Sequence, residues 1–129
     1  MIEVRVYSED TDAGGVVYHA GYLRYLERGR VEFLRARGIA VGELHRQGYI
    51  LPVMRLEIDY LAPAVPDDLL QVETRVLEIA SATFLLGQQV VRASDGKLLV
   101  EGKVTLVCVG PGMKVRRLPK ELLQALGIP

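Results

Sequence analysis

The chain has 129 residues, of which half are hydrophobic and a quarter charged, and its 16 basic side chains balance 16 acidic ones. This length fits one globular domain and is too short for two, so we expect a single domain over residues 1–129. The balanced charge argues against nucleic acid or an anionic membrane as a partner, and the lack of a signal peptide and of an apolar run near about 18 residues predicts a cytoplasmic protein without a membrane span.

The first part of the chain predicts a strand, a loop and one long helix. Residues 3–7 alternate as a half-buried strand does, and the polar, glycine-containing stretch 8–15 breaks that pattern. From about 16 to 37 the apolar residues follow a helical period, and Gly38 is a natural stop for this helix. Apolar residues on the predicted inner face are Tyr22, Leu26, Gly29 and Phe33, with Leu23, Arg30 and Leu34 beside them.

The remainder predicts antiparallel strands and a short closing helix. The strands are expected at 50–60, 69–79, 83–92 and 98–109, with a hairpin turn at 94–97 and a helix at 118–126. This order predicts an α+β fold, with an antiparallel sheet wrapped around one long central helix. Such a sheet leaves edges uncovered, and apolar residues on both faces (Leu85, Leu86, Val90, Val91) favour a homo-oligomer.

The stretch from Glu9 to His19 carries the candidate chemistry. It combines two carboxylates, two glycines and a histidine at the point where a strand leads into a helix. Free backbone amides at a helix start favour a bound anion or a developing oxyanion, and Asp12 would place a carboxylate beside them. A plain capping loop, with Asp10 or Asp12 as the cap, explains the same residues equally well.

Metal and nucleotide sites are not indicated. A calcium loop that began at Asp10 would need a glutamate eleven residues later, where the chain has Gly21. The two histidines and the single cysteine do not make a zinc site, and the sequence has no glycine-rich phosphate loop. We therefore expect no bound metal.

Several blocks of the chain resemble the 4-hydroxybenzoyl-CoA thioesterase family of hot-dog proteins, most closely its bacterial branch associated with the Tol–Pal cell-envelope system. The likeness covers nearly the whole chain. The blocks are Tyr7, 9–12, 15–19, Tyr22, Leu23, Glu27 with Arg30, 50–53, 60–64, 67–69 and 114–119.

The resemblance implies an acyl-CoA thioesterase with Asp12 as its catalytic carboxylate. It also implies that the backbone amide at His19 polarises the thioester carbonyl, while the His19 side chain positions water or the acyl group. Subunits of the family pair their sheets, and two dimers often form a homotetramer. Active sites then lie between subunits, so that residues 51–55 would face the partner's Asp12 loop. No cofactor is expected beyond the CoA of the substrate.

Further residues are assigned around this predicted site. Candidate substrate-binding residues are Tyr18, Tyr22, Leu51, Val53, Met54 and Arg55. The CoA phosphates are expected near Lys114, Arg116 and Arg117, with Arg55 and Lys120 as further candidates, although a solvated basic tail explains these side chains equally well.

Other possibilities stay open at this point. Asp12 acts either as a nucleophile or as a general base on water. Glu27 is the reserve catalytic carboxylate, His45 is expected in a solvated loop or at a helix end, and Cys108 as an inert buried residue. The alternative function is a non-catalytic hot-dog scaffold that contacts acyl carrier protein or envelope machinery. The sequence leaves the preferred acyl chain, the pathway and the choice between dimer and tetramer open.

Overall fold

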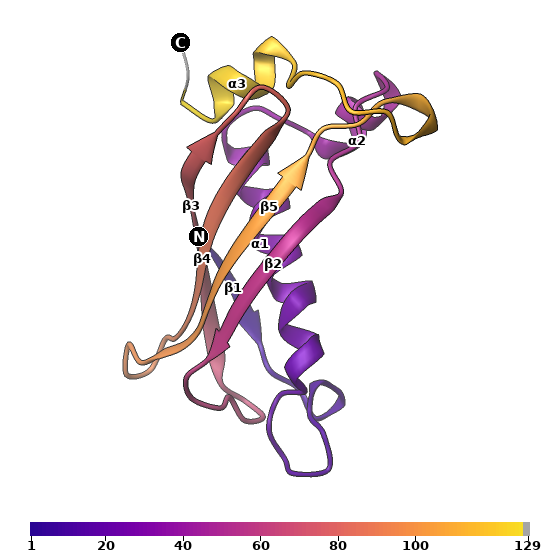
Figure 1. The fold of residues 1–129 in the computed structure, drawn as a ribbon. Helices are drawn as coiled ribbons and strands as arrows, with labels where there is room; N and C mark the ends of the chain where they lie inside the picture. Colours follow the sequence, from indigo (N-terminus) through magenta and orange to yellow (C-terminus); the bar gives the residue numbers. More distant parts are fainter. Residues whose placement is uncertain (128–129) are drawn as a thin grey trace.

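A five-stranded antiparallel sheet curls around one long helix in the computed structural model, which describes residues 1–127 (Figure 1). The strand order is β1-β3-β4-β5-β2. The strands are β1 (Ile2–Arg5), β2 (Val53–Tyr60), β3 (Leu69–Ile79), β4 (Thr83–Arg92) and β5 (Leu98–Val107). The helices are α1 (Tyr22–Ala36), α2 (Val41–Arg46) and α3 (Lys120–Ala125), with 3-10 turns η1 (Ser8–Asp10), η2 (His19–Gly21) and η3 (Pro111–Met113). The predicted α+β class and hot-dog fold are confirmed.

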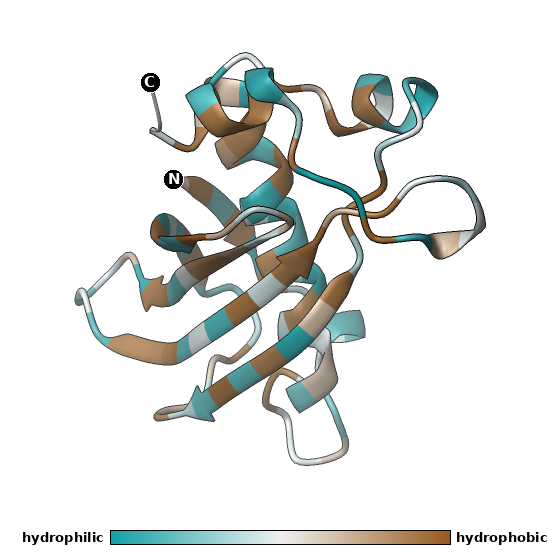
Figure 2. Ribbon diagram, turned by 45° about the horizontal axis from the view of Figure 1, so that its top comes forward, coloured by the Kyte–Doolittle hydropathy of each residue, from teal (hydrophilic) through white to brown (hydrophobic). Residues whose placement is uncertain are grey.

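Alternating hydropathy explains how the sheet holds the helix. The strands carry alternating apolar and polar bands (Figure 2), so one face can be buried while the other stays polar. On the central strand β4, Phe84, Leu86 and Val90 are buried on the inner face. Gly29 of α1 lets the helix approach closely, because a Cβ there would lie 2.7 Å from Cγ1 of Val72.

One buried polar side chain sets the position of α1 along the sheet. Gln88 of β4 donates from Nε2 to the carbonyl of Leu26 and to Oγ1 of Thr74, both at 2.9 Å. Its Oε1 accepts a hydrogen bond from the Arg30 guanidinium at 3.3 Å. Apolar contacts are non-directional, whereas these bonds are directional, so Gln88 favours one register of the helix over the sheet.

The boundaries of the predicted elements are correct at β3 and β4 and differ elsewhere. The long helix begins with η2 at His19 and becomes α-helical at Tyr22, whereas the sequence predicted a start near Val16. Helix α2 was not predicted, and His45 lies exposed in its last turn. On α1, Tyr25 is buried in the core and Leu23 is 38% exposed, because Tyr25 stands three residues after Tyr22 and four before Gly29 and so shares their face.

The fold separates two ends of the molecule. The loops that precede α1 lie at one end, together with the β2–β3 connection, and α2, α3 and the η3 loop lie at the other (Figure 1). Strand β2 joins the two ends, and its eight residues span roughly 23 Å. Within residues 1–127 no helix is long and apolar enough to cross a membrane.

Candidate active site

A tight hairpin over residues 11–17 carries Asp12. Thr11 and Val17 form a β-bridge, and the Asp12 amide donates to the Val16 carbonyl at 2.9 Å. Gly15 closes the turn with φ +78°, a left-handed conformation that side-chain-bearing residues rarely adopt. This hairpin is the reason that residues 16 and 17 do not join the helix.

The Asp12 carboxylate is held by one oxygen only. Its Oδ1 accepts a hydrogen bond from the Gly14 amide at 2.8 Å, and a Cβ on Gly14 would lie 3.2 Å from that oxygen. No bond to the other oxygen arises from residues 1–127, so its lone pairs are free for a reacting group. Asp10 differs, because its Oδ2 accepts from the Tyr7 amide at 2.8 Å and caps η1. Asp10 thus caps the 3-10 turn η1, whereas neither Asp10 nor Asp12 caps η2 or α1.

The helix begins directly after this hairpin, at His19. As the first residue of η2, His19 has a backbone N–H that no carbonyl within the helix can accept. Its carbonyl accepts a 2.7 Å hydrogen bond from the Tyr60 hydroxyl. The His19 ring is exposed and contacts the Tyr18 ring, with centroids 4.5 Å apart. The helix start thus presents a free donor whose position is fixed from β2.

Asp12 and the helix start share one pocket of about 340 Å³. The pocket is lined by Asp12, Val16, Val17, His19, Tyr22, Tyr60, Leu61, Ala62 and Pro63. Of the residues predicted from the sequence, Asp12, His19 and Tyr22 therefore come together. Tyr60 was missed, although it belongs to a block (60–64) that carries the family likeness, and its position at the end of β2 was the available signal.

The two tyrosines of this pocket are protonated donors. Burial raises the pKa of Tyr22, and it also raises the pKa of Tyr60. Their rings lie 5.7 Å apart and form the apolar wall next to Asp12. Since neither phenol ionises near neutral pH, neither provides a base, and Asp12 is the carboxylate that lines this pocket.

A second pocket, of about 270 Å³, lies at the other end of β2. Its walls are mostly apolar, and Glu27 and Arg30 are its charged members. Its lining residues are Glu27, Arg30, Val31, Leu34, Val41, Leu51, Pro52, Val53 and Leu106. The predicted substrate residues Leu51 and Val53, and the reserve carboxylate Glu27, are thus separated from Asp12 within one chain.

The remaining predicted residues lie outside both pockets. Tyr18 lines a different cavity with Glu9, Asp10 and Arg24, and Met54 is 58% exposed on β2. Arg55 pairs with Glu57 at 2.7 Å. Three basic residues follow η3 near the second pocket's end of the molecule: Lys114, Arg116 and Arg117.

Near that end, Arg116 makes contacts within the chain and Cys108 is buried. The Arg116 guanidinium lies 3.9 Å above the Tyr49 ring and donates to the Gly48 carbonyl at 3.2 Å. Cys108 is buried, and burial raises the pKa of its thiol. Among residues 1–127 no group of three or more His, Cys, Asp or Glu side chains is arranged to hold a metal ion.

Comparison with known proteins supports a thioesterase. The family model described as the thioesterase-like superfamily matches residues 6–126. The acyl-CoA thioesterase YbgC of Haemophilus influenzae is 46% identical over 124 residues, which cover 95% of this chain and 90% of that protein. The acyl-CoA thioester hydrolase YbgC of Escherichia coli is 41% identical over 121 residues, with coverage of 93% and 90%.

A solved structure agrees with these sequence relatives. The 1,4-dihydroxy-2-naphthoyl-CoA thioesterase from Synechocystis matches with a TM-score of 0.90 at 26% identity, and the match covers 97% of this chain and 93% of that one. The chain therefore belongs to the thioesterase-like superfamily and is, as its sequence predicts, a thioester hydrolase.

Proposed function

We propose that this protein hydrolyses the thioester of short-chain or aromatic acyl-CoA to the free acid and CoA. The observation that carries the proposal is the shared pocket of Asp12 and His19, in which a carboxylate with a free oxygen lies beside a free helix-start amide. The relatives named as acyl-CoA thioesterases, at 41% and 46% identity, support the same substrate class.

Two routes use these groups with balanced chemistry. As a general base, Asp12 takes a proton from water while the water oxygen attacks the carbonyl; as a nucleophile, it attacks the carbonyl directly and forms a mixed anhydride that water then cleaves. In both, the His19 amide stabilises the oxyanion, and the CoA sulfur leaves as a thiolate. Neither route requires a metal or a cofactor besides the CoA of the substrate.

We further propose that the working unit is a dimer joined along β2. Within residues 1–127 this strand is hydrogen-bonded only to β5, and its free edge exposes apolar side chains, among them Val53 at 47% and Met54 at 58%. A free apolar edge favours pairing with another strand. Antiparallel pairing with a second β2 would bring the partner's apolar pocket to the Asp12 end. Two such dimers would form the homotetramer that the family resemblance implies.

The first experiment measures thiol release from acyl-CoAs that range from acetyl to palmitoyl and include benzoyl. We expect hydrolysis by the native protein and a loss of at least about a hundredfold in kcat for Asp12→Asn, which keeps an acceptor for the Gly14 amide but removes the charge. The matched control is Asp10→Asn, in the same loop, which should stay near native activity because Asp10 lines another cavity.

The outcomes separate the proposals. No turnover with any acyl-CoA would contradict the proposed substrate class and favour a binding role. Turnover that persists in Asp12→Asn would move the chemistry to another group, with Glu27 the next to replace. The order of substrates would identify the preferred acyl chain, which the sequence leaves open.

A further inference from the structure

The β2–β3 connection, residues 61–68, forms one wall of the Asp12 pocket and also holds the Asp12 hairpin in place. Leu61, Ala62 and Pro63 line the pocket. The next residue, Ala64, is fully buried, and its carbonyl accepts a 2.9 Å hydrogen bond from the Val17 amide. Since Val17 ends the hairpin that begins beside Asp12, the position of Ala64 determines where the hairpin meets the helix start.

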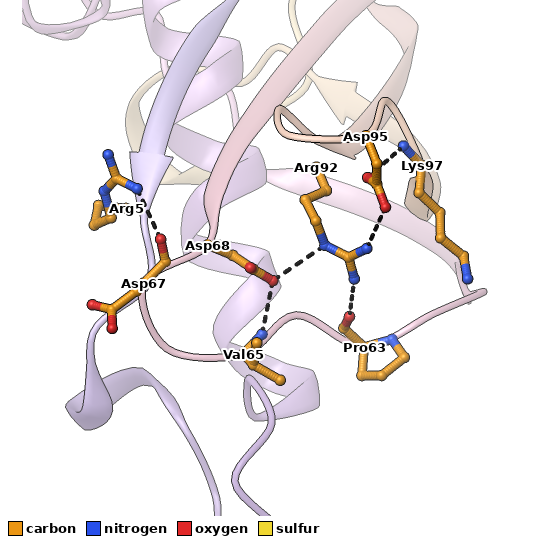
Figure 3. A network of polar contacts seen from close by, with 8 residues as sticks. All are labelled: Arg5, Pro63, Val65, Asp67, Asp68, Arg92, Asp95 and Lys97. Atoms are coloured by element: carbon orange, nitrogen blue, oxygen red, sulfur yellow. Dashed lines mark hydrogen bonds and ion pairs between the residues drawn. The ribbon is translucent and has the colours of Figure 1, made fainter.

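An ion pair holds the two neighbours of Ala64 (Figure 3). Arg92, the last residue of β4, donates from Nη2 to the Pro63 carbonyl at 3.0 Å and from Nε to Oδ2 of Asp68 at 3.3 Å. The same Asp68 oxygen accepts a hydrogen bond from the Val65 amide at 3.1 Å. One residue on each side of Ala64 is therefore held by a hydrogen bond, and between them the Ala64 carbonyl points toward the Val17 amide.

The ion pair of Arg92 and Asp68, which we call the clamp, is partly shielded from water. The exposed fractions of the Arg92 and Asp68 side chains are 21% and 18%, so water screens their attraction less than at a fully exposed ion pair. The third contact of Arg92 is different. Its Nη1 donates to the more exposed Asp95 at 2.8 Å, and Asp95 makes its other bond to the Lys97 amide in the β4–β5 turn (Figure 3).

We propose that Arg92 and Asp68 are positioning residues for the thioesterase reaction. They orient the Ala64 carbonyl and, through the Val17 amide, set the distance between the Asp12 carboxylate and the His19 N–H. The proposal rests on the proposed function for the roles of Asp12 and His19. Neither Arg92 nor Asp68 lines the pocket, so their effect is on geometry and not on substrate contact.

Such positioning acts on the chemical step. A displacement of about 1 Å between reacting groups can cost up to about a hundredfold in rate. Loss of the clamp should therefore lower kcat while KM changes little, since the pocket walls that contact the acyl group remain. A purely structural ion pair would instead lower thermal stability and leave kcat of the folded fraction at the native value.

The test compares Arg92→Met, Asp68→Asn and the double variant with Asp95→Asn as the matched control. We expect Arg92→Met and Asp68→Asn each to lower kcat at least about tenfold, with KM within about twofold of native. The double variant should be no slower than the slower single, because both remove the same clamp. Asp95→Asn should keep native kcat, since an asparagine still accepts the hydrogen bond from Arg92 Nη1 and Asp95 makes no hydrogen bond to residues 61–68.

Arg92→Lys guards against a variant that fails to fold. It keeps the charge beside Asp68 but cannot reach Asp68 and Pro63 together, so its kcat should fall between those of native protein and Arg92→Met. Native kcat in both Arg92 variants, or an equal loss in Asp95→Asn, would overturn the proposal.

Hydrogen exchange tests the clamp without any activity. The Val17 amide should exchange at least about tenfold faster in Arg92→Met, while the Leu86 amide in the central strand β4 keeps its native rate. Unchanged Val17 exchange would overturn the clamp. If the native protein hydrolyses no acyl-CoA, the proposed function fails, and this measurement still decides whether Arg92 and Asp68 hold the hairpin.

Discussion

The two ends of β2 differ in what they offer a thioester. At the Tyr60 end, the pocket has a carboxylate with a free oxygen and a free helix-start amide beside an exposed surface. At the Val53 end, the pocket is smaller and mostly apolar, and its carboxylate, Glu27, comes from the middle of α1 and not from a loop before a helix start. One end has polar reaction groups, and the other has an apolar wall. The comparison teaches that, within one chain, the candidate reaction groups and the apolar pocket lie at opposite ends of β2.

In the proposed dimer, the exposed edge of β2 would bring these two ends together. The lengthwise separation of roughly 23 Å is far too great for one small acyl group to contact both ends of a single chain. Antiparallel pairing of two β2 strands reverses one chain relative to the other, so that each Tyr60 end meets a partner's Val53 end. Variants at the two ends would show whether the Tyr60 end of one chain acts together with the Val53 end of another, and the largest effect is expected for Asp12 and Val53.

Mixing two inactive variants should restore activity if the site is shared. We expect Asp12→Asn and Val53→Arg each to lose at least about a hundredfold in kcat/KM, the second because a charge would enter the apolar wall. Unfolded and refolded together, they should recover about a quarter of native activity, because half of the dimers then carry one intact site. Sedimentation velocity would check that every sample keeps the native mass.

The mixing experiment can also fail informatively. Full activity of Val53→Arg alone would remove the Val53 end from the site. A mixture as inactive as its components, at native mass, would mean that Asp12 and Val53 of different chains do not act together. The exposure of Val53 allows an arginine there without a clash in the core of the single chain.

Tyr60→Phe should have a smaller effect that is confined to the Tyr60 end. Its hydroxyl makes the 2.7 Å bond to the His19 carbonyl, so its loss frees the helix start and should lower kcat about tenfold. Stability should fall by about 1 kcal/mol in urea unfolding. Tyr49→Phe, at the opposite end of the molecule, is the control. An unchanged kcat for Tyr60→Phe would show that the free amide does not depend on β2.

Tyr25→Phe should affect stability and its pH dependence. The Tyr25 hydroxyl is buried without a hydrogen-bond partner among residues 1–127, and burial, with the Asp10 carboxylate nearby, raises its pKa to about 12 from 10.0. The unfolded chain therefore loses this proton first, so the free energy of unfolding should fall as pH rises from 10 toward 12. The variant should lack this part of the fall and be up to about 1 kcal/mol more stable at neutral pH.

Urea unfolding at pH 7 and pH 11 would measure this difference, with the exposed Tyr7→Phe as the control. The native protein and Tyr7→Phe should weaken together at the higher pH, and Tyr25→Phe should weaken less. Equal losses in all three proteins would mean that the Tyr25 hydroxyl ionises as freely in the folded chain as in the unfolded one.

Much of the fold could be predicted from local pattern. Strands β3 and β4 have the bounds that alternation predicts, because one more buried face imposes a period of two over most of their length, up to the bulge after Val76 in β3. The start of α1 could not be predicted in this way. Val16 and Val17 are apolar and directly precede the helical pattern, but the Thr11–Val17 β-bridge and the Ala64 carbonyl hold Val17 outside the helix.

The candidate site could likewise be predicted only where it depends on residues that are neighbours in the chain. Its identity as a carboxylate followed by a helix start is local, and Asp12 with His19 could be chosen from neighbouring residues and the family likeness. Tyr60, Pro63 and Arg92 are remote in the chain, and no local period indicates that they meet the Asp12 hairpin. Their contribution depends on which loops the strand order brings together.

By itself, the sequence determined the strand periods, the apolar face of α1 and the segment that carries the candidate catalytic residues. All three depend on residues within one or two turns of one another. Only the tertiary structure decided that Tyr60 and Pro63 join Asp12 and His19 in one pocket, and that the predicted acyl wall lies at the far end of β2. The physical reason is that hydrogen bonds and pockets form between residues that are close in space, and the closure of the sheet around α1 sets that closeness.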